Sequence, residues 1–453
     1  KNIVFDFFAQ TPRHKRPTDE LNFYDVILDF GDTQQVFHGG LASMAVPGNI
    51  AGLFHVHRRL GKMPFRELAQ PAIELAKKGI VVDDYFKWCI GLVGPIQTSL
   101  PTGKQHLEPQ GRPLQVGDTF CMSPFANMLE FLAIEGPREF YEGEIAKQIV
   151  KDCRVGGGHL TMDDFIHYQV VERKPLTVSY RNWEIATNPP PSAGGTMIAF
   201  TLKMLEKFDL KRHGFGSEQH LQYLTHAQRI TKAARSATFD QHQYEPDIVD
   251  RYFHHLHIDK WHIELLAALN RWGSTTHLSV ADQYGNWASV TTSFGAGCGY
   301  VVPNTGIMMN NMLGEADLNP KGFHLWQPNQ RITSMMSPTF VLKDKKPFFA
   351  TGTGGANRIR TTIAQVISNL IDFEMSPQEA IEAPRLHWEE GEINIEPGFP
   401  EESVAAITTP EPLKKKVFAQ KAFYFGGAHS VFCEGDSLNG VGDARRVGAV
   451  MKT

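Results

Sequence analysis

Gly273-Ser-Thr-Thr-His-Leu-Ser279 is the stretch on which the interpretation of this chain of 453 residues depends. A small, flexible Gly-Ser pair precedes two threonines at the start of a segment with β-strand character. Cleavage of the Ser274–Thr275 bond would give Thr275 a free α-amine, whose unperturbed pKa is about 7.7–8.0. Such an amine can act as general base for the hydroxyl of the same residue. Two threonines that merely begin an ordinary strand explain the same pattern when it is taken alone.

Two further loops carry residue types that acyl transfer uses. Thr351-Gly-Thr-Gly-Gly-Ala-Asn-Arg358 lies between an apolar strand and a helix, and its glycines allow backbone N–H groups to approach a developing oxyanion. It lacks the Lys-Ser/Thr ending of a phosphate-binding loop and the glycine spacing of a dinucleotide site. Arg331-Ile-Thr-Ser-Met-Met-Ser-Pro338 is a hydroxyl-rich loop before a strand. Each is also compatible with an ordinary turn.

Composition limits the class of protein. The chain is 42% hydrophobic and 21% charged, with a formal net charge of −4, so no global field favours nucleic acid or an anionic membrane. Its five cysteines are scattered and show neither a disulfide framework nor a zinc-ligand spacing. No apolar run is long enough to span a bilayer, and Lys1-Asn-Ile-Val-Phe-Asp6 is not the start of a signal peptide. A small-molecule substrate fits this balance best, with no cofactor and no metal.

The order of apolar patterns predicts a layered α/β architecture. Helices are expected in residues 43–82, 126–134, 145–152, 196–208, 218–267 and 360–373, with a helix N-terminus at 161–164. Strands are expected at residues 176–180, 183–186, 338–342 and 347–350, and residues 276–291 are expected to form a β-hairpin. Pro189-Pro-Pro-Ser-Ala-Gly-Gly195 is expected to be a stiff turn before the helix at 196.

Collinear motifs resemble those of the γ-glutamyltranspeptidase family over nearly the whole chain. In the second half they are Thr275-Thr-His-Leu-Ser-Val-Ala-Asp282, Gly306-Ile-Met-Met-Asn-Asn311, Arg331–Thr339, Thr351–Arg358 and Gly442-Asp-Ala-Arg-Arg446. In the first half they are Ala45-Val-Pro-Gly48, Val171-Glu-Arg-Lys-Pro-Leu176 and Pro189–Gly195. The resemblance implies a four-layer αββα sandwich of the N-terminal-nucleophile hydrolase type. It also implies a precursor that cleaves itself before Thr275, into a large-subunit portion, 1–274, and a small-subunit portion, 275–453, which together form one structural unit.

The resemblance further implies roles for individual residues. Thr275 would be the nucleophile, and Gly354 and Gly355 would supply oxyanion-hole amides. Ser293 stands where the family has a threonine near the nucleophile's amine. Thr333 and Ser334 would bind the α-carboxylate of the substrate, and Asn311 and Glu315 would bind its α-amino group. The family usually has Asp at the position of Glu315. The substrate would be a γ-glutamyl amide such as glutathione, and water or an amino acid or peptide would accept the acyl group.

The chain departs from the family at three places. Phe8 stands where the family has an arginine that pairs with the glutamyl α-carboxylate; Phe8 is then either an acyl-pocket residue or part of the core, and Arg13 or His14 is a candidate to compensate. The stretch between Asn311 and Arg331 is short, which predicts a site without a lid. An early family segment of the Asn-Ala-Val-Asp-Ala-Ala-Val type is missing, so we expect that the large-subunit portion is N-terminally incomplete. The compartment, cytoplasmic or exported, stays open for a protein expected to be soluble.

Two alternatives to γ-glutamyl transfer remain open at this point. Phe8 motivates a cephalosporin- or glutaryl-type acylase that keeps the Thr275 nucleophile. An uncleaved, catalytically silent homologue is the other alternative. His254-His-Leu-His257 is interpreted as a helical surface and not as a metal site, and Asp443, Arg445 and Arg446 as a structural ion-pair cluster.

Overall fold

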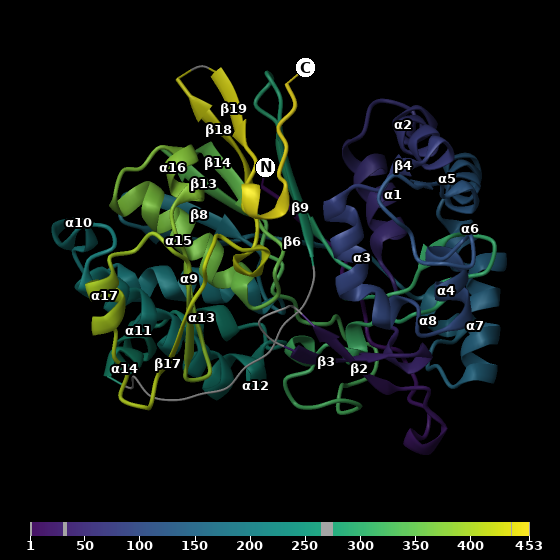
Figure 1. Ribbon diagram of the computed structural model, residues 1–453, viewed down its shortest axis with the longest axis horizontal. Helices are drawn as coiled ribbons and strands as arrows, with labels where there is room; N and C mark the ends of the chain where they lie inside the picture. Colours follow the sequence, from purple (N-terminus) through teal and green to yellow (C-terminus); the bar gives the residue numbers. More distant parts are fainter. Residues whose placement is uncertain (1, 30–33, 264–274, 436, 453) are drawn as a thin grey trace. The chain divides into compact units, whose positions relative to one another are not determined.

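The computed structural model describes residues 2–29, 34–263, 275–435 and 437–452 (Figure 1). The chain forms two compact units. Unit 1 consists of Lys1–Asn2, Lys174–Ser293 and Thr333–Thr453, and unit 2 of Ile3–Arg173 and Phe294–Ile332. Each unit takes segments from both sides of the predicted cleavage point. The subunit division 1–274 and 275–453, and the joining of both portions in one structural unit, therefore remain predictions.

Unit 1 is built on a six-stranded sheet in which every neighbouring pair is antiparallel. The strand order is β19-β18-β14-β13-β8-β7. The strands are β7 Leu176–Tyr180, β8 Trp183–Thr187, β13 Thr339–Lys343, β14 Lys346–Gly352, β18 His429–Glu434 and β19 Ser437–Val441. The four strands predicted from the sequence all lie in this sheet, β7 and β8 next to one another and β13 beside β14.

Two apolar helices and a hairpin pack on this sheet. α9 (Ala193–Leu205) buries every residue except Lys203, and α15 (Arg358–Asp372) is buried over almost its whole length. The two helices pack against each other, α9 also against β7 and β8 and α15 against β14. The hairpin of β9 (Thr276–Ala281) and β10 (Trp287–Thr292) packs against β14. A helical layer, a sheet and a hairpin thus build unit 1 (Figure 1), as the predicted α/β layering requires.

Further helices and a small sheet complete unit 1. α11 (Glu218–Ala234) packs on α9 and on a three-stranded sheet in the order β15-β16-β17. The other elements are α10 Leu210–His213, η3 Arg235–Phe239, α12 Asp240–His242, α13 Ile248–Tyr252, α14 His255–Ile263, α16 Pro377–Glu382, β15 Leu386–Glu389, β16 Glu392–Ile395, α17 Glu401–Ala406, β17 Lys414–Val417, η6 Phe423–Phe425 and η7 Ala444–Arg446. The predicted helical region 218–267 is confirmed as far as residue 263, and residues 264–267 lie outside the described residues.

Unit 2 is mainly helical. Its helices are α1 Asn49–Leu60, α2 Phe65–Lys78, α3 Asp84–Gln97, α4 Pro101–Leu107, α5 Ser123–Glu135, α6 Arg138–Tyr141, α7 Glu144–Gly156 and α8 Met162–Ile166, with short 3-10 turns η1 Thr18–Glu20, η2 Leu41–Ser43, η4 Met312–Gly314 and η5 Ala316–Leu318. Its strands form four pairs, namely β1 Val4–Asp6 with β6 Val171–Arg173, β2 Tyr24–Asp29 with β3 Gln34–Gly39, β4 Ile80–Val81 with β5 Thr119–Phe120, and β11 Val301–Val302 with β12 Ile307–Met308. The predicted helix start at 161–164 is confirmed by a capping box between Thr161 and Asp164.

The turn predicted at 189–195 is wrong at its C-terminal end, because α9 already begins at Ala193. The reason is a close backbone approach. A Cβ at Gly194 would lie 2.2 Å from the carbonyl oxygen of Met335, and the Gly194 N–H donates to the Ser334 carbonyl at 2.9 Å. Gly194 thus serves the contact between the helix start and the loop before β13, and Gly195 allows an equally close approach to Asn188, where a Cβ would lie 2.2 Å from the carbonyl oxygen.

A buried ion cluster joins three segments of unit 1. Arg385 pairs with Asp443 at 2.7 Å, and Arg445 pairs with both Asp443 and Glu396; all four side chains are almost fully buried. Burial by itself raises the pKa of Asp443, but the two guanidinium groups and backbone N–H groups outweigh it and lower that pKa to about 2. The structural interpretation of Asp443 and Arg445 is therefore confirmed.

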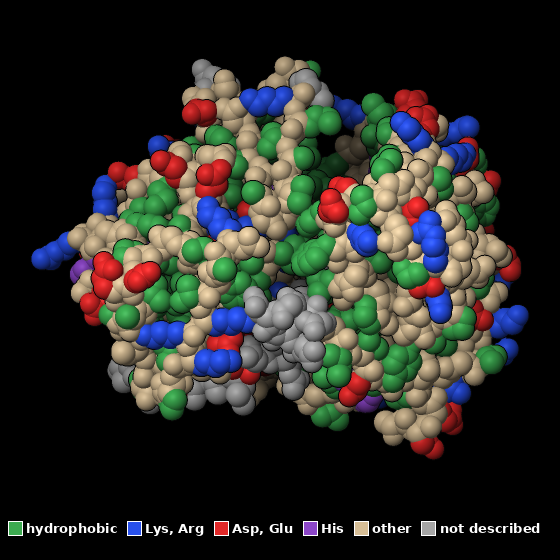
Figure 2. Space-filling view, viewed as in Figure 1, with side chains coloured by type: hydrophobic (Ala, Val, Ile, Leu, Met, Phe, Trp, Pro, Cys, Tyr) green, Lys and Arg blue, Asp and Glu red, His purple; other side chains and the backbone are tan. Residues whose placement is uncertain are grey.

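The surface carries side chains of both charge signs. Figure 2 shows Lys and Arg interspersed with Asp and Glu over the face in view, in agreement with the small net charge of −4. Among the helices that the structure describes, none combines the length and the apolar character that crossing a membrane requires.

The buried cluster gives a stability prediction. Asp443→Asn is expected to lower the free energy of unfolding by about 3–5 kcal/mol, because two buried guanidinium groups lose a carboxylate partner. Urea unfolding followed by tryptophan fluorescence measures this change. The matched control is Glu142→Gln, which removes the exposed Arg138–Glu142 pair and is expected to cost less than about 1 kcal/mol. Equal losses in the two variants would contradict the assignment.

Candidate active site

The motif segments of unit 1 meet at one end of the six-stranded sheet. Thr339 at the start of β13 is paired with Thr351 near the end of β14, and Gly352 is paired with His429 at the start of β18. Thr187, the last residue of β8, shares a hydrogen bond of 3.0 Å with the Thr339 hydroxyl. The loops after β8, before β13, after β14 and before β18 therefore all leave the sheet at the same end. Segments far apart in the sequence are brought together by antiparallel register.

Thr275 lies at this end, in contact with the glycine loop that follows β14. It is partly exposed and directly precedes β9, whereas Ser274 lies outside the described residues. A Cβ built on Gly354 would stand 1.8 Å from the Thr275 carbonyl oxygen, far inside van der Waals contact. Position 354 accepts only glycine in this arrangement. The structure thus places two of the predicted catalytic residues directly against each other.

Gly355 continues the loop with a backbone that favours glycine, at φ +129°. Its carbonyl accepts from the Arg358 N–H at 3.0 Å as α15 begins. Neither the Gly354 nor the Gly355 N–H donates a hydrogen bond to another residue that the structure describes. Two glycine amides at the start of a fifteen-residue helix are the kind of donors that an oxyanion needs.

The hairpin sets the position of Ser293. The last pair of β9 and β10 is Thr276 with Thr292, so Ser293 follows one residue beyond the partner of Thr276, in line with Thr275. Next to this pair, His277 is held by the hydroxyls of Thr291 at 2.8 Å and Ser279 at 2.9 Å. Burial lowers the pKa of His277 to about 3, so its imidazole is neutral near pH 7 and stabilises the hairpin.

Thr333 and Ser334 lie beside the start of α9. The Thr333 hydroxyl donates to the Pro191 carbonyl at 2.8 Å and must turn away from it to donate to a ligand. The Ser334 hydroxyl accepts from the Met336 N–H at 3.0 Å, which leaves its own proton for donation. The Ser334 carbonyl accepts from the Ser192 hydroxyl at 2.9 Å. The structure therefore joins the 189–195 motif to the 331–338 motif.

Asn311 and Glu315 belong to unit 2, where both are buried and bound to one backbone amide. The Ala296 N–H donates to Asn311 Oδ1 at 2.9 Å and to Glu315 Oε1 at 3.2 Å. Asn311 Nδ2 also donates to the His38 carbonyl at 3.3 Å. These contacts show a structural role, which the sequence motif alone does not indicate. The role in binding an α-amino group remains a prediction.

Phe8 also belongs to unit 2 and is half-buried. Its ring packs against an apolar cluster made of Ala9, Ala45, Met312, Leu313, Trp326 and Ile332. The buried Arg331 donates to the Phe8 carbonyl and to the Tyr168 hydroxyl. Arg13, a candidate replacement for the missing arginine, pairs with Asp163 at 2.7 Å. Both interpretations of Phe8, core residue and acyl-pocket residue, agree with this packing.

Arg446 is a site residue that sequence reasoning missed. The prediction that it belongs to the ion cluster is wrong, because its Nη1 donates to the Thr275 carbonyl at 3.3 Å and its guanidinium stacks 3.7 Å from the Phe423 ring centroid. A Cβ at Gly354 would stand 2.7 Å from the same Nη1. The only signal in the sequence was the adjacency of two arginines in Gly442–Arg446, which does not say that neighbouring side chains point to different partners.

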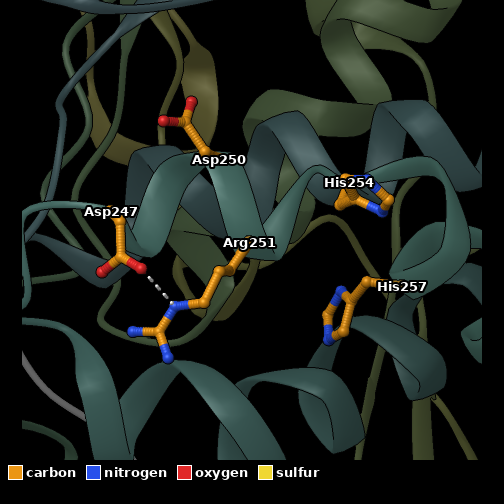
Figure 3. A pocket seen from close by; sticks show the side chains of 5 residues that line it. All are labelled: Asp247, Asp250, Arg251, His254 and His257. Carbon is orange, nitrogen blue, oxygen red and sulfur yellow. Dashed lines mark ion pairs between the residues drawn. The ribbon is translucent and has the colours of Figure 1, made fainter.

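The histidine-rich segment lines a separate hollow of 410 Å³, formed by Asp247, Asp250, Arg251, His254 and His257 (Figure 3). Arg251 pairs with Asp247 at 3.1 Å. The two nitrogens of His257 are occupied, one by the Tyr252 carbonyl at 2.8 Å and the other by the Trp261 N–H at 2.9 Å. Within the described residues no group of three or more His, Cys, Asp or Glu side chains is arranged to hold a metal ion.

Solved structures show the class of fold. The fold is similar to that of cephalosporin acylase from Bacillus halodurans, with a TM-score of 0.82, 23% identity and coverage of 99% of this chain and 84% of that one. It is also similar to Helicobacter pylori γ-glutamyltranspeptidase, with a TM-score of 0.51, 25% identity and coverage of 60% and 76%. The predicted α/β fold of the N-terminal-nucleophile hydrolase type is confirmed.

Sequence comparison gives the family. The family model described as Gamma-glutamyltranspeptidase matches residues 19–453, and the chain belongs to this family of enzymes. The glutathione hydrolase proenzyme of Escherichia coli (strain K12) is 32% identical, over 92% of this chain and 76% of that protein. The acylase ACY 1 proenzyme of Pseudomonas sp. (strain SE83) is 34% identical, over 84% and 70%. The predicted class of enzyme is confirmed, while γ-glutamyl hydrolases and acylases are both among the relatives.

The contact between Gly354 and Thr275 gives an activity prediction. Gly354→Ala is expected to lower kcat/KM for an amide substrate by at least about 100-fold, because the added methyl group must displace the Thr275 carbonyl or the oxyanion donors. Steady-state hydrolysis of an acyl anilide measures it. The control is Gly91→Ala in α3, where a Cβ meets nothing within 4 Å, and this variant is expected to keep wild-type activity. Comparable activity in the two variants would contradict the assignment of Gly354 to the active site.

Proposed function

We propose that the chain is the precursor of an amide hydrolase or acyltransferase that cleaves its own Ser274–Thr275 bond and then acts through an acyl-enzyme on Thr275. The observation that carries this proposal is the contact of Gly354 with the Thr275 carbonyl, where two glycine amides stand beside a partly exposed hydroxyl residue. The names of the E. coli and Pseudomonas relatives, which describe both as proenzymes, support a cleaved precursor.

The mechanism follows from the chemistry of these groups. The free α-amine of Thr275 accepts the proton of the Thr275 hydroxyl while Oγ attacks the substrate carbonyl carbon. The oxyanion that forms is stabilised by the Gly354 and Gly355 amides. The intermediate then collapses, and the leaving amine takes the proton from the α-ammonium group. Water or an amino acceptor attacks the resulting ester and regenerates Thr275, with Ser293 in line to orient the α-amine.

γ-Glutamyl amides such as glutathione are the first class of substrate that we propose. Family membership supports them, and so does the Ser334 hydroxyl, which keeps a proton to donate to a carboxylate next to the start of α9. Helix N-termini favour negative charge. In this proposal Thr333 and Ser334 bind the α-carboxylate, and Asn311 and Glu315 bind the α-amino group in addition to the Ala296 amide.

A glutaryl- or cephalosporin-type acylase is the second candidate, favoured by Phe8. A bidentate arginine–carboxylate pair is stronger than hydrogen bonds between neutral groups, so its replacement by a half-buried phenyl ring weakens recognition of the carboxylate. The ring is part of the same apolar cluster as Met312 and Leu313, directly after Asn311. Such apolar surroundings favour an acyl group with fewer charged groups than γ-glutamyl, and glutaryl has one charged group where γ-glutamyl has two.

Self-cleavage gives the first test of the proposal. The wild-type chain is expected to run as two bands on a denaturing gel, the smaller one with the N-terminal sequence Thr-Thr-His-Leu, whereas Thr275→Ala stays a single band without amidase activity. Thr276→Ala is the control, because Thr276 is exposed and is expected to be cleaved as wild type. A single wild-type band, or an active Thr275→Ala variant, would favour the silent homologue or another nucleophile.

The acyl group is tested with three anilides: γ-glutamyl, glutaryl, which lacks the α-amino group, and pentanoyl, which also lacks the carboxylate. The γ-glutamyl proposal predicts the highest kcat/KM for the first, and the acylase proposal predicts it for the second. Phe8→Arg is expected to raise kcat/KM for the γ-glutamyl and glutaryl anilides, which both carry a carboxylate, about tenfold relative to pentanoyl anilide, because it restores an ion pair.

The control for this substitution is Phe5→Arg, at another half-buried phenylalanine, which lies in β1 and whose ring contacts His55. This variant is expected to leave the ratios between the three anilides unchanged. If Phe8→Arg changes all three rates by the same factor, Phe8 acts only as a core residue and carries no selectivity.

A further inference from the structure

We propose that Arg446 is a positioning residue for the nucleophile: its guanidinium fixes the Thr275 carbonyl and keeps a positive charge beside the α-amine, so that the freed amine stays in its neutral, basic form. This inference rests on the proposed function, because it needs Thr275 as a free N-terminus. It assigns a role to a side chain that lies 171 residues away along the chain.

The geometry fixes Arg446 on three sides. Nη1 donates to the Thr275 carbonyl at 3.3 Å, and the guanidinium stacks on the Phe423 ring at 3.7 Å. Its aliphatic stem passes over Gly427, where an added Cβ would lie 2.6 Å from Arg446 Cβ and 3.0 Å from Cδ. A guanidinium stacked on a ring and packed along its stem has little rotational freedom. The charge is therefore held at a fixed place next to the backbone of Thr275.

A fixed charge at this distance acts on the amine through space. The amine and the carbonyl oxygen belong to the same residue, so the guanidinium lies within roughly 6–7 Å of the amine nitrogen. A like charge at such a distance disfavours the protonated ammonium form. The expected consequence is a lowering of the apparent pKa of the amine by about one unit from its ordinary value of about 7.7–8.0.

The other titratable groups around Thr275 do not replace this effect. Burial lowers the pKa of His277 to about 3 and that of His429 below its usual range, so both are neutral near pH 7. Lys346 of β14 and Glu434 of β18 stand at the far ends of their strands. Asp443 is paired with Arg385 and Arg445. Arg358 stacks on Tyr424 and keeps its charge in wild type and in the Arg446 variants alike, so a difference between them reports Arg446.

The test is the pH dependence of kcat/KM for an acyl anilide in the mature enzyme. In Arg446→Gln the acidic limb is expected to move to higher pH by about one unit, towards pH 8, because the ammonium form loses a repelling neighbour. That value is above the ordinary pKa of a histidine, so the limb cannot be assigned to His277 or His429. Arg446→Lys keeps the charge and is expected to keep the wild-type limb with a lower kcat. Arg212→Gln, at an exposed arginine of α10, is the control and leaves the profile unchanged.

Each outcome decides the proposal. A limb of Arg446→Gln that coincides with wild type overturns it, and so does an equal shift in Arg446→Lys. If Arg446→Gln remains an uncleaved single band, the Arg446→Lys variant decides. Cleavage of Arg446→Lys with the wild-type acidic limb supports the proposed effect of the positive charge. Failure of Arg446→Lys to cleave shows that Arg446 is needed only for folding. Failure of the proposed function is distinguishable, because the wild-type chain itself would then stay uncleaved or Thr275→Ala would stay active.

Discussion

The close approach of the Gly354 backbone to the Thr275 carbonyl is the constraint on which the rest of the candidate site depends. A single methyl group at position 354 would stand 1.8 Å from that oxygen, so the loop after β14 and the start of β9 can meet only because the side chain is absent. The contact has a chemical consequence. It holds the glycine loop, whose amides are the proposed oxyanion donors, against the residue that is proposed as the nucleophile.

That contact is stable because the segments around it are tied down by buried charges. Asp443 binds Arg385 and Arg445 and also accepts from the Ala428 N–H at 2.9 Å, which fixes the loop before β18. A second cluster involves α15, where Glu389 binds Lys232 and Arg360, and their positive charges outweigh burial and lower the pKa of Glu389. Buried pairs of this kind contribute little net stability but are costly to break, so they favour one arrangement of the loops.

Local pattern was enough to predict the elements that build the site. The hairpin follows from alternating residues on both sides of a Gln-Tyr-Gly-Asn turn, and the structure places it at Thr276–Ala281 and Trp287–Thr292. The sequence could not show which strand ends meet, because this depends on a sheet order in which β8 is next to β13 and β14 next to β18. For the same reason Arg446 escaped prediction: its partner is 171 residues away, and its neighbour Arg445 points into a different, buried cluster.

Motif residues are not all functional to the same degree, and Asn311 and Glu315 illustrate the difference. Both side chains bind the Ala296 N–H, next to Gly295, where the backbone has φ +68° and a Cβ would stand 2.0 Å from Asn311 Oδ1. The tight loop of unit 2 needs these acceptors whether or not a ligand binds, so their presence in a family motif has a sufficient structural cause. At Gly354 the three nearest atoms that a side chain would meet belong to Thr275 and Arg446, which are residues of the candidate site itself. Resemblance to the family is therefore stronger evidence for a functional role at Gly354 than at Asn311. The specificity for the acyl group has to be inferred from residues such as Phe8, at which this chain differs from the family.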